Sequence, residues 1–244
     1  MRYPGARHSR DADLLYSGSD TPGLESAISA LQEAAKLDLG DSIGFMLYDR
    51  TKPSENHAGI TARFGVFVGT GRLTIISVDV VVDHVPIGNT VVAPLTPVLD
   101  VRGVEDWPDI QLYPVVDHVA DKICAIVERR GIDNKRVSTR YRDLIDLVLI
   151  SRNEEIDGAQ LHQVLRREVL RRQGRGIAIE LPQCFAVPDR VSWTSGYARA
   201  VKDVDDFDGF RTLAPAEQLA AMFIDPLLAD DPPGSWQPTQ QAWV

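Results

Sequence analysis

The sequence has little cysteine and no long hydrophobic run, and each absence argues against a class of protein. Cys124 and Cys184 are the only cysteines among 244 residues, and they form no Cys-x-x-Cys pair. This usage argues against a disulfide scaffold and against a structural zinc site. No segment approaches the roughly 18 apolar residues of a membrane span, and no apolar stretch follows the charged N-terminus as in a secretory signal. We therefore expect a cytoplasmic protein with no membrane partner.

The composition is acidic but otherwise that of a folded protein. Lys and Arg number 26 and Asp and Glu number 35, which gives a formal net charge of −9. Charged residues make up 25% and hydrophobic residues 44% of the chain, which argues against disorder. The length suits one large domain or two small ones. The net acidity argues against indiscriminate coating of nucleic acid, although it leaves room for a local basic surface.

Strand-like segments come first along the chain and helical segments follow. Runs rich in β-branched and aromatic residues predict strands at 43–48, 61–68 and 73–82. Apolar periodicity predicts helices at 115–130, 138–150, 157–172, 191–202 and 214–227. An earlier helix is predicted to begin at Thr21-Pro22 and to end near Gly40, and proline-rich residues 84–114 are predicted as loop with short extended pieces.

This order predicts an α+β fold, a sheet domain followed by a helical region. We assign 1–112 to the sheet domain, 113–230 to the helical region and 231–244 to an irregular tail.

Two acidic residues near the N-terminus are the first candidates for chemistry. If residues 10–16 are extended, Asp11 and Asp13 point to the same face, because side chains alternate along a strand. Two carboxylates so close repel each other unless a cation lies between them, and Mg²⁺ suits such hard oxygen ligands. A solvated pair of Asp residues beside a turn is the alternative interpretation.

A third carboxylate lies within the most apolar predicted strand. Residues 73–82 are apolar on both faces, which is typical of a central buried strand, and Asp79 lies in the middle. A buried carboxylate needs a partner, which could be an arginine such as Arg63 or Arg72, a hydrogen-bond network or a metal. With Asp11 and Asp13 on a neighbouring strand, the three could hold the metal ions used in phosphoryl and nucleotidyl transfer.

The helices at 115–130 and 138–150 supply candidate cationic groups. Lys122 and Arg129 are seven residues apart, which places them on one helix face away from the apolar stripe. Both could project toward a metal-bound triphosphate and neutralise developing charge. Asp143 is interpreted as facing roughly opposite to Asp146 on the second helix. Core helices with solvated charges are the alternative.

Four segments in this order carry a resemblance to a known family. They read RHSRDADLL, TIISVDVVV, YPVVDHVADKICAIVERR and STRYRDLIDLVLI. Together they resemble the AbiEii/AbiGii toxin family of nucleotidyltransferases, within the wider polymerase-β-like superfamily. The resemblance covers about residues 5–150, and it implies a mixed β-sheet with flanking helices, as in other nucleotidyltransferases.

The resemblance implies a role for each matching residue. Asp11 and Asp13 would hold Mg²⁺ and the nucleoside triphosphate, with Ser9 beside them in the phosphate-binding turn. Lys122 would contact the triphosphate, and Asp143 would complete the charged site or position the incoming hydroxyl. Asp79 has the position of the superfamily's third carboxylate.

The resemblance also implies an activity, which is transfer of a nucleoside monophosphate from an NTP to an RNA acceptor, for several members the tRNA 3′ end. The protein would then be the toxin of a toxin–antitoxin system, restrained by a cognate antitoxin. A protein acceptor is one alternative, and a degenerate protein that binds nucleotide or partner without catalysis is another. Superfamily members carry a Gly-Gly or Gly-Ser turn ten or more residues before the Asp pair. Only ten residues precede Asp11, so we expect that Met1 is an internal methionine.

A later helix offers a candidate RNA surface. Residues 161–175 carry five Arg and one Glu in an otherwise acidic chain. Arg167 and Arg171 are predicted to form one ridge, with Arg172 and Arg175 near the helix end. Such a ridge could bind an RNA backbone, whereas arginines near a helix C-terminus also favour the macrodipole and keep the surface soluble. Both interpretations stay open at this point.

Overall fold

The computed structural model describes residues 11–17, 23–38, 40, 42–51, 59–82, 84–94 and 109–244, without the side chains of Asp11 and Ile132. The chain divides into two compact units. We call Ser9–Val85 the sheet unit, and we call the unit that contains Pro86–Val244 the helical unit.

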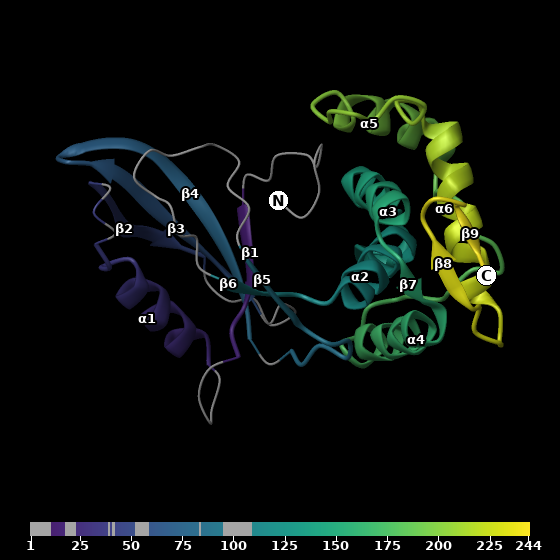
Figure 1. Ribbon diagram of the computed structural model, residues 1–244, viewed down its shortest axis with the longest axis horizontal. Helices are drawn as coiled ribbons and strands as arrows, with labels where there is room; N and C mark the ends of the chain where they lie inside the picture. Colours follow the sequence, from purple (N-terminus) through teal and green to yellow (C-terminus); the bar gives the residue numbers. More distant parts are fainter. Residues whose placement is uncertain are drawn as a thin grey trace. The chain divides into compact units, whose positions relative to one another are not determined.

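A four-stranded mixed sheet forms the sheet unit, drawn in purple and blue in Figure 1. Its strands are β1 (Asp11–Leu15), β2 (Ile43–Arg50), β3 (Gly59–Val68) and β4 (Gly71–Val81). Their spatial order is β1-β4-β3-β2, in which β1 runs parallel to β4 and the other pairs are antiparallel. The predicted strands at 43–48, 61–68 and 73–82 are confirmed, and Gly69 forms the turn between the last two with a positive φ of 59°.

Helix α1 (Leu24–Ala34) covers one face of this sheet (Figure 1). Ala27 and Ile28 of α1 are buried against alternate residues of β3 and β4, as the two-residue strand period requires. The sheet side of this core consists of Ile60, Ala62, Phe64, Val78, Val80 and Val82. The predicted helix start at Thr21-Pro22 lies outside the described residues. The helix ends at Ala34, before the predicted Gly40.

Strand β4 is not buried on both faces, so that prediction is wrong. Leu73 is 69% exposed and Ile75 is 42% exposed, whereas Val78 and Val80 are buried under α1. An apolar run indicates a strand that can be buried on both sides, but only the packing of other elements decides whether each side is covered.

The helical unit begins with a hairpin and continues with helices. The hairpin pairs β5 (Val91–Pro94) with β6 (Asp109–Leu112), which confirms short extended pieces within 84–114. The helices are α2 (Val115–Val127), the 3₁₀ turn η1 (Ile132–Asn134), α3 (Tyr141–Asn153), α4 (Gly158–Gly174), α5 (Arg190–Ala200) and α6 (Leu213–Leu228). All five predicted helices are confirmed with small shifts at their ends, and their apolar faces form one core. No helix among the described residues is long and apolar enough to cross a membrane.

The predicted irregular tail is ordered and paired. Strands β8 (Ser235–Gln237) and β9 (Ala242–Trp243) form a small sheet with β7 (Ile156–Asp157). Trp236 is fully buried and donates its indole N–H to the Ser151 carbonyl at 2.7 Å, and Trp243 stacks on Phe223. Burial of these two indoles offsets the entropy lost in ordering the segment.

The boundary between the units differs from the predicted one. It lies between Val85 and Pro86 rather than near residue 112. Ile87 packs against the helical core, and the buried Asp117 carboxylate accepts the N–H groups of Ile87 at 2.8 Å and Gly88 at 2.7 Å. These contacts tie Ile87 and Gly88 to the helical unit.

Substitution of Gly158 tests how tightly the C-terminal strands are docked. A Cβ at Gly158 would lie 2.2 Å from the Gly234 carbonyl oxygen and 2.4 Å from that of Pro233. Both neighbours are backbone, so Gly158→Ala should lower the free energy of unfolding by about 1–3 kcal/mol through overpacking. Denaturant titration followed by circular dichroism measures the change.

Gly174→Ala, on the same helix, is the matched control. No atom lies within 4 Å of a Cβ at Gly174, so this variant should be neutral or more stable by up to about 1 kcal/mol. Equal unfolding midpoints for the two variants would contradict the close approach.

Candidate functional site

The predicted carboxylates lie on adjacent strands of the sheet unit. The parallel pairing of β1 with β4 places Asp13 directly opposite Asp79, and Asp11 opposite Ser77. Partners in a parallel ladder point to the same face, and residues two apart on one strand do so as well. This is the face opposite α1, because Val78 and Val80 point to the helix. The side chain of Asp11 is not among those described, and Ser9 lies outside the described residues.

Asp79 has a hydrogen-bond partner rather than an arginine. The Thr61 hydroxyl, on the neighbouring strand β3, donates to Asp79 Oδ1. Arg63 instead lies 3.8 Å from Asp49, and Arg72 lies over the Tyr48 ring. The alternative of an Asp79–Arg63 or Asp79–Arg72 pair is therefore wrong. Asp79 is only half-buried, so solvent lowers the cost of its charge.

The donor set of this face suits a hard cation. Asp13 is exposed, and its neighbour Asp79 contributes a second carboxylate from the next strand. Mg²⁺ typically binds proteins through one or two carboxylates and completes its shell with substrate phosphates and water. Among the side chains that the structure describes, no group of three His, Cys, Asp or Glu could hold a metal. Asp13 and Asp79 therefore suit a cation that completes its shell with further oxygen ligands.

A second group of charges is buried between α2 and α3 of the helical unit. Lys122 Nζ lies 2.7 Å from Asp146 Oδ2 and 3.3 Å from Asp143 Oδ1. Arg140 Nε donates to the other oxygen of Asp143 at 2.5 Å. Lys122 and Asp143 are 8% and 3% exposed, so these charges are almost wholly removed from water. The arrangement holds the ammonium in one position by charge-assisted hydrogen bonds.

Asp143 and Asp146 share a helix face, so the prediction that they face opposite sides is wrong. Residues three apart on an α-helix are neighbours on its surface, and both carboxylates reach the same ammonium. Asp146 makes the shorter contact with Lys122, although it was not predicted as a site residue. Its spacing of three from Asp143 was the signal in the sequence that could have identified it.

The carboxylates raise the pKa of Lys122. Burial alone lowers that pKa, but the negative charges and hydrogen bonds of Asp146 and Asp143 more than offset it. Lys122 is therefore fully charged at neutral pH and acts as a fixed positive charge rather than as a base.

The prediction that Arg129 shares a helix face with Lys122 is wrong. Helix α2 ends at Val127, and Glu128 is extended with φ −62° and ψ 150°. Arg129 continues this extended segment, and its N–H donates to the Ala178 carbonyl at 2.9 Å. Helical spacing therefore does not extend from Lys122 to Arg129, which is exposed.

The arginines of α4 are divided between the interior and the surface. Arg172 is 7% exposed and pairs with Glu128, Glu168 and Asp121. Arg171 pairs with the same Glu168 at 2.6 Å. Of the predicted ridge, Arg167 is exposed and Arg171 is paired with Glu168, whereas Arg172, predicted near the helix end, belongs to the ion-pair network of the core.

The structure thus assembles two groups of the predicted residues, each within its own unit. Asp13 and Asp79 are neighbours in the sheet unit, whereas Lys122 and Asp143 are in contact in the helical unit. A pair of carboxylates can bind a cation, and a fixed ammonium can bind a phosphate.

Comparison with known proteins gives one family match. A family profile described as nucleotidyl transferase AbiEii toxin, type IV TA system, matches residues 1–243. The match therefore extends through both units. No curated protein sequence matches the chain.

Removal of the buried ammonium should destabilise the helical unit. Lys122→Met leaves Asp146 and Asp143 without their shared partner, and breaking a buried pair in this way costs about 3–5 kcal/mol. Because Arg140 still pairs with Asp143, we expect a loss near the lower limit. Denaturant unfolding measures this loss of unfolding free energy.

Lys135→Met is the control. Lys135 and Asp133 are both largely exposed, so their ion pair should contribute almost nothing to the free energy of unfolding. Equal stabilities of the two variants would show that the buried pair is not stabilising.

Above about pH 6, the stabilisation by Lys122 should change only in the alkaline range. Its pKa in the folded protein is raised above the ordinary value of 10.5, so the contribution is complete below that value. It is lost as the pH rises through the higher folded pKa. The difference in unfolding free energy between wild type and Lys122→Met should therefore be constant from about pH 6 to about pH 9 and should shrink at higher pH. A difference that disappears below pH 9 would contradict the raised pKa.

Proposed function

The chain belongs to the AbiEii family of nucleotidyl transferase toxins of type IV toxin–antitoxin systems, and from this we propose that it transfers a nucleoside monophosphate from an NTP to RNA. The proposed acceptor is the 3′ end of tRNA and the proposed metal is Mg²⁺. The register that makes Asp13 the direct neighbour of Asp79 on one sheet face is the observation that carries this proposal.

The proposed metal ligands are Asp11, Asp13 and Asp79. All three belong to one face of two adjacent strands, and carboxylate oxygens are the ligands that Mg²⁺ prefers. A bound Mg²⁺ would supply positive charge next to the phosphate oxygens on which charge develops. The Thr61 hydroxyl, hydrogen-bonded to Asp79, orients that carboxylate. Ser9 is proposed to bind phosphate beside Asp11.

Lys122 is proposed to bind the triphosphate. The reaction forms a bond between the acceptor hydroxyl oxygen and the α-phosphorus and breaks the bond to pyrophosphate, while the hydroxyl proton is released. Lys122 neutralises negative charge on the phosphates, and Asp146 and Asp143 fix its position before substrate arrives. Asp143 is the proposed catalytic carboxylate that positions the hydroxyl, and Arg129 is a further proposed phosphate contact.

The proposed setting is the cytoplasm, where NTP, tRNA and an antitoxin are all present. Type IV toxin–antitoxin membership implies the antitoxin as a partner. Modification of the tRNA 3′ end would prevent aminoacylation, which would account for toxicity.

Incubation with total tRNA and each α-³²P-labelled NTP in turn tests the proposal. We expect label from at least one NTP in tRNA, and we expect Asp13→Asn to reduce it by at least about a hundredfold, because an electrostatic contact to the transition state is lost. Asp49→Asn is the matched control, since Asp49 is an exposed carboxylate of the same sheet on edge strand β2. Its activity should equal that of wild type.

Other outcomes of the same incubation would overturn the RNA acceptor. Label in protein but not in tRNA would establish a protein acceptor. NTP binding without any transfer would establish a binding protein without catalysis. Equal loss of activity in Asp13→Asn and Asp49→Asn would remove the specific role of Asp13.

A further inference from the structure

The segment between helices α2 and α3 is strongly basic in an acidic chain. Residues 129–142 contain six Lys or Arg and one Asp, a net charge of +5, whereas the whole chain carries −9. Arg129, Arg130, Lys135, Arg136, Arg140 and Arg142 are all exposed. A positive region this dense is a local feature that the overall charge does not explain.

This segment has a defined backbone structure. Arg130 and Arg136 exchange two backbone hydrogen bonds of 2.9 Å, which close the short turn between them. The Arg129 N–H is held by Ala178, and the Ser138 hydroxyl donates to the buried Ala125 carbonyl at 2.6 Å. The cationic side chains therefore project from a preformed loop, so less entropy is lost when a partner binds.

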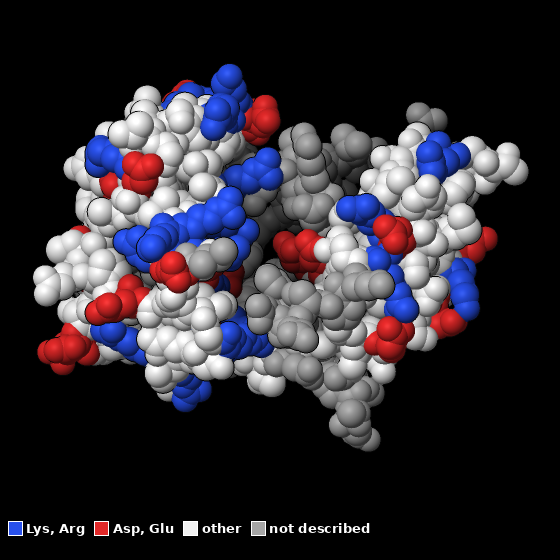
Figure 2. Space-filling view, turned by 180° about the vertical axis from the view of Figure 1, so that it is seen from behind, with Lys and Arg blue, Asp and Glu red and all other residues white. Residues whose placement is uncertain are grey.

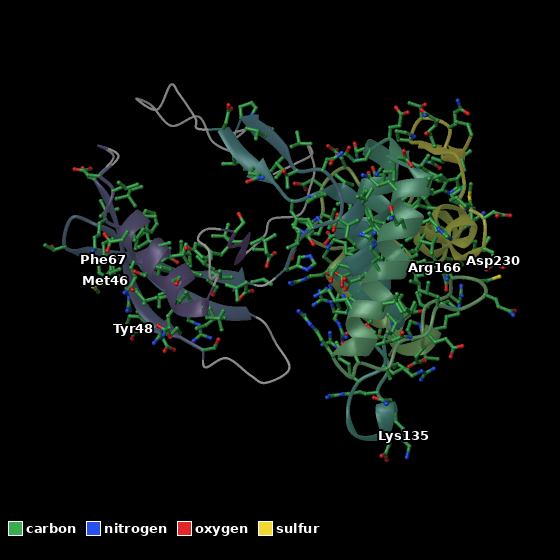
Figure 3. All side chains as sticks on the ribbon, turned by 90° about the horizontal axis from the view of Figure 1, so that it is seen from below. Met46, Tyr48, Phe67, Lys135, Arg166 and Asp230 are labelled. Carbon is green, nitrogen blue, oxygen red and sulfur yellow. The ribbon has the colours of Figure 1, made fainter. Side chains whose placement is uncertain are left out.

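Much of this charge is not neutralised by acidic neighbours. Within the described part of the chain, Arg129 and Arg136 form no ion pair. Figure 3 shows Lys135 at the tip of the segment, away from the helices of this unit, and its contact with Asp133 is long and exposed. Figure 2 shows Lys and Arg side chains gathered in a continuous group on the helical unit.

The end of α4 adds positive charge beside this loop. The backbone bond between Arg129 and Ala178 places the loop next to the segment that follows Arg175. Arg175 is exposed, and its pKa is lowered first by partial burial and then by the positive charges of Arg171 and Arg172. Arg175 therefore adds an exposed positive charge close to the loop, which increases the attraction of this region for a polyanion.

The loop is also connected to the buried charge cluster. Arg140 lies at its end and donates to Asp143, which in turn contacts Lys122. A ligand that follows the loop past Arg140 would reach the residues proposed to act on the triphosphate.

We propose that Arg129, Lys135, Arg136 and Arg175, the basic loop surface, bind the phosphate backbone of the RNA acceptor. This inference rests on the proposed function, because it identifies the surface that binds the RNA acceptor of that reaction. Three of the four residues are arginines, whose planar guanidinium groups bind phosphate by two parallel hydrogen bonds. A group of exposed cations on and beside one loop suits the closely spaced phosphates of an RNA backbone better than the scattered carboxylates of an acidic protein.

Binding of 5′-fluorescein-labelled tRNA to the full-length chain, measured by anisotropy over a range of salt concentrations, tests the proposal. The triple variant Lys135→Gln, Arg136→Gln, Arg175→Gln leaves the residues of the proposed reaction unchanged and should bind at least about tenfold more weakly at low salt. The slope of log K against log salt should fall by about two to three, one for each lost phosphate contact. Gln keeps most of each side-chain stem, and circular dichroism checks the fold.

The control variant removes the same charge elsewhere on the helical unit. Arg199→Gln, Lys202→Gln, Arg211→Gln also replaces three exposed cations, at α5 and before α6, and should bind tRNA like wild type. An equal loss of tRNA affinity in the two triple variants would show that binding depends only on the net charge of the protein, and it would overturn the proposal. Displacement of tRNA by polyglutamate as readily as by unlabelled tRNA would identify an acidic protein as the ligand and would also overturn it.

The same variants separate this inference from the proposed transfer reaction. Wild-type binding that is lost in the loop variant, without labelling of tRNA by any NTP, would support the surface and contradict the reaction. Labelling of tRNA with an unchanged KM for tRNA in the loop variant would support the reaction and contradict the surface.

Discussion

A charge buried in a protein must be paired, and this constraint organises the helical unit. Lys122 lies between Asp143 and Asp146, and Arg172 is surrounded by carboxylates from α2 and α4. Among the described residues, no buried polar side-chain atom lacks a hydrogen-bond partner. Because an unpaired charge in this interior would cost several kcal/mol, each pair fixes the relative position of the helices that supply it.

The same constraint separates structural cations from those available to a ligand. Arg172 is neutralised in the core, whereas Arg129 and Arg136 remain on the surface without acidic partners in the described residues. Lys122 is intermediate, because it is buried but lies in a cluster linked through Asp143 to the exposed Arg140. A fixed ammonium of this kind can stabilise negative charge with little reorganisation of the protein. A nucleotidyltransferase requires such stabilisation of the charge on the reacting phosphates.

Local sequence patterns predicted most of the fold and part of the candidate site. The three predicted strands and five later helices are present because β-branched and aromatic runs favour strands and a 3.6-residue apolar period marks the buried face of a helix. The separate expectation that Asp13 and Asp79 lie on adjacent strands is confirmed by the pairing of β1 with β4. The patterns failed at Arg129, where the helix ends two residues earlier, and at 231–244, where Trp236 packs against Ser151 far away in the chain.

The sequence by itself determined the order of the elements, the pair of acidic residues on β1 and the density of positive charge at 129–142, since these depend only on neighbours along the chain. Tertiary structure alone decided that Asp146 contacts Lys122, that Thr61 donates to Asp79 and that Arg172 pairs with Glu128 in the core. Those pairings join residues far apart in the chain. Burial depends on the whole fold, and it decides whether a charged side chain pairs inside the protein or stays accessible to a ligand.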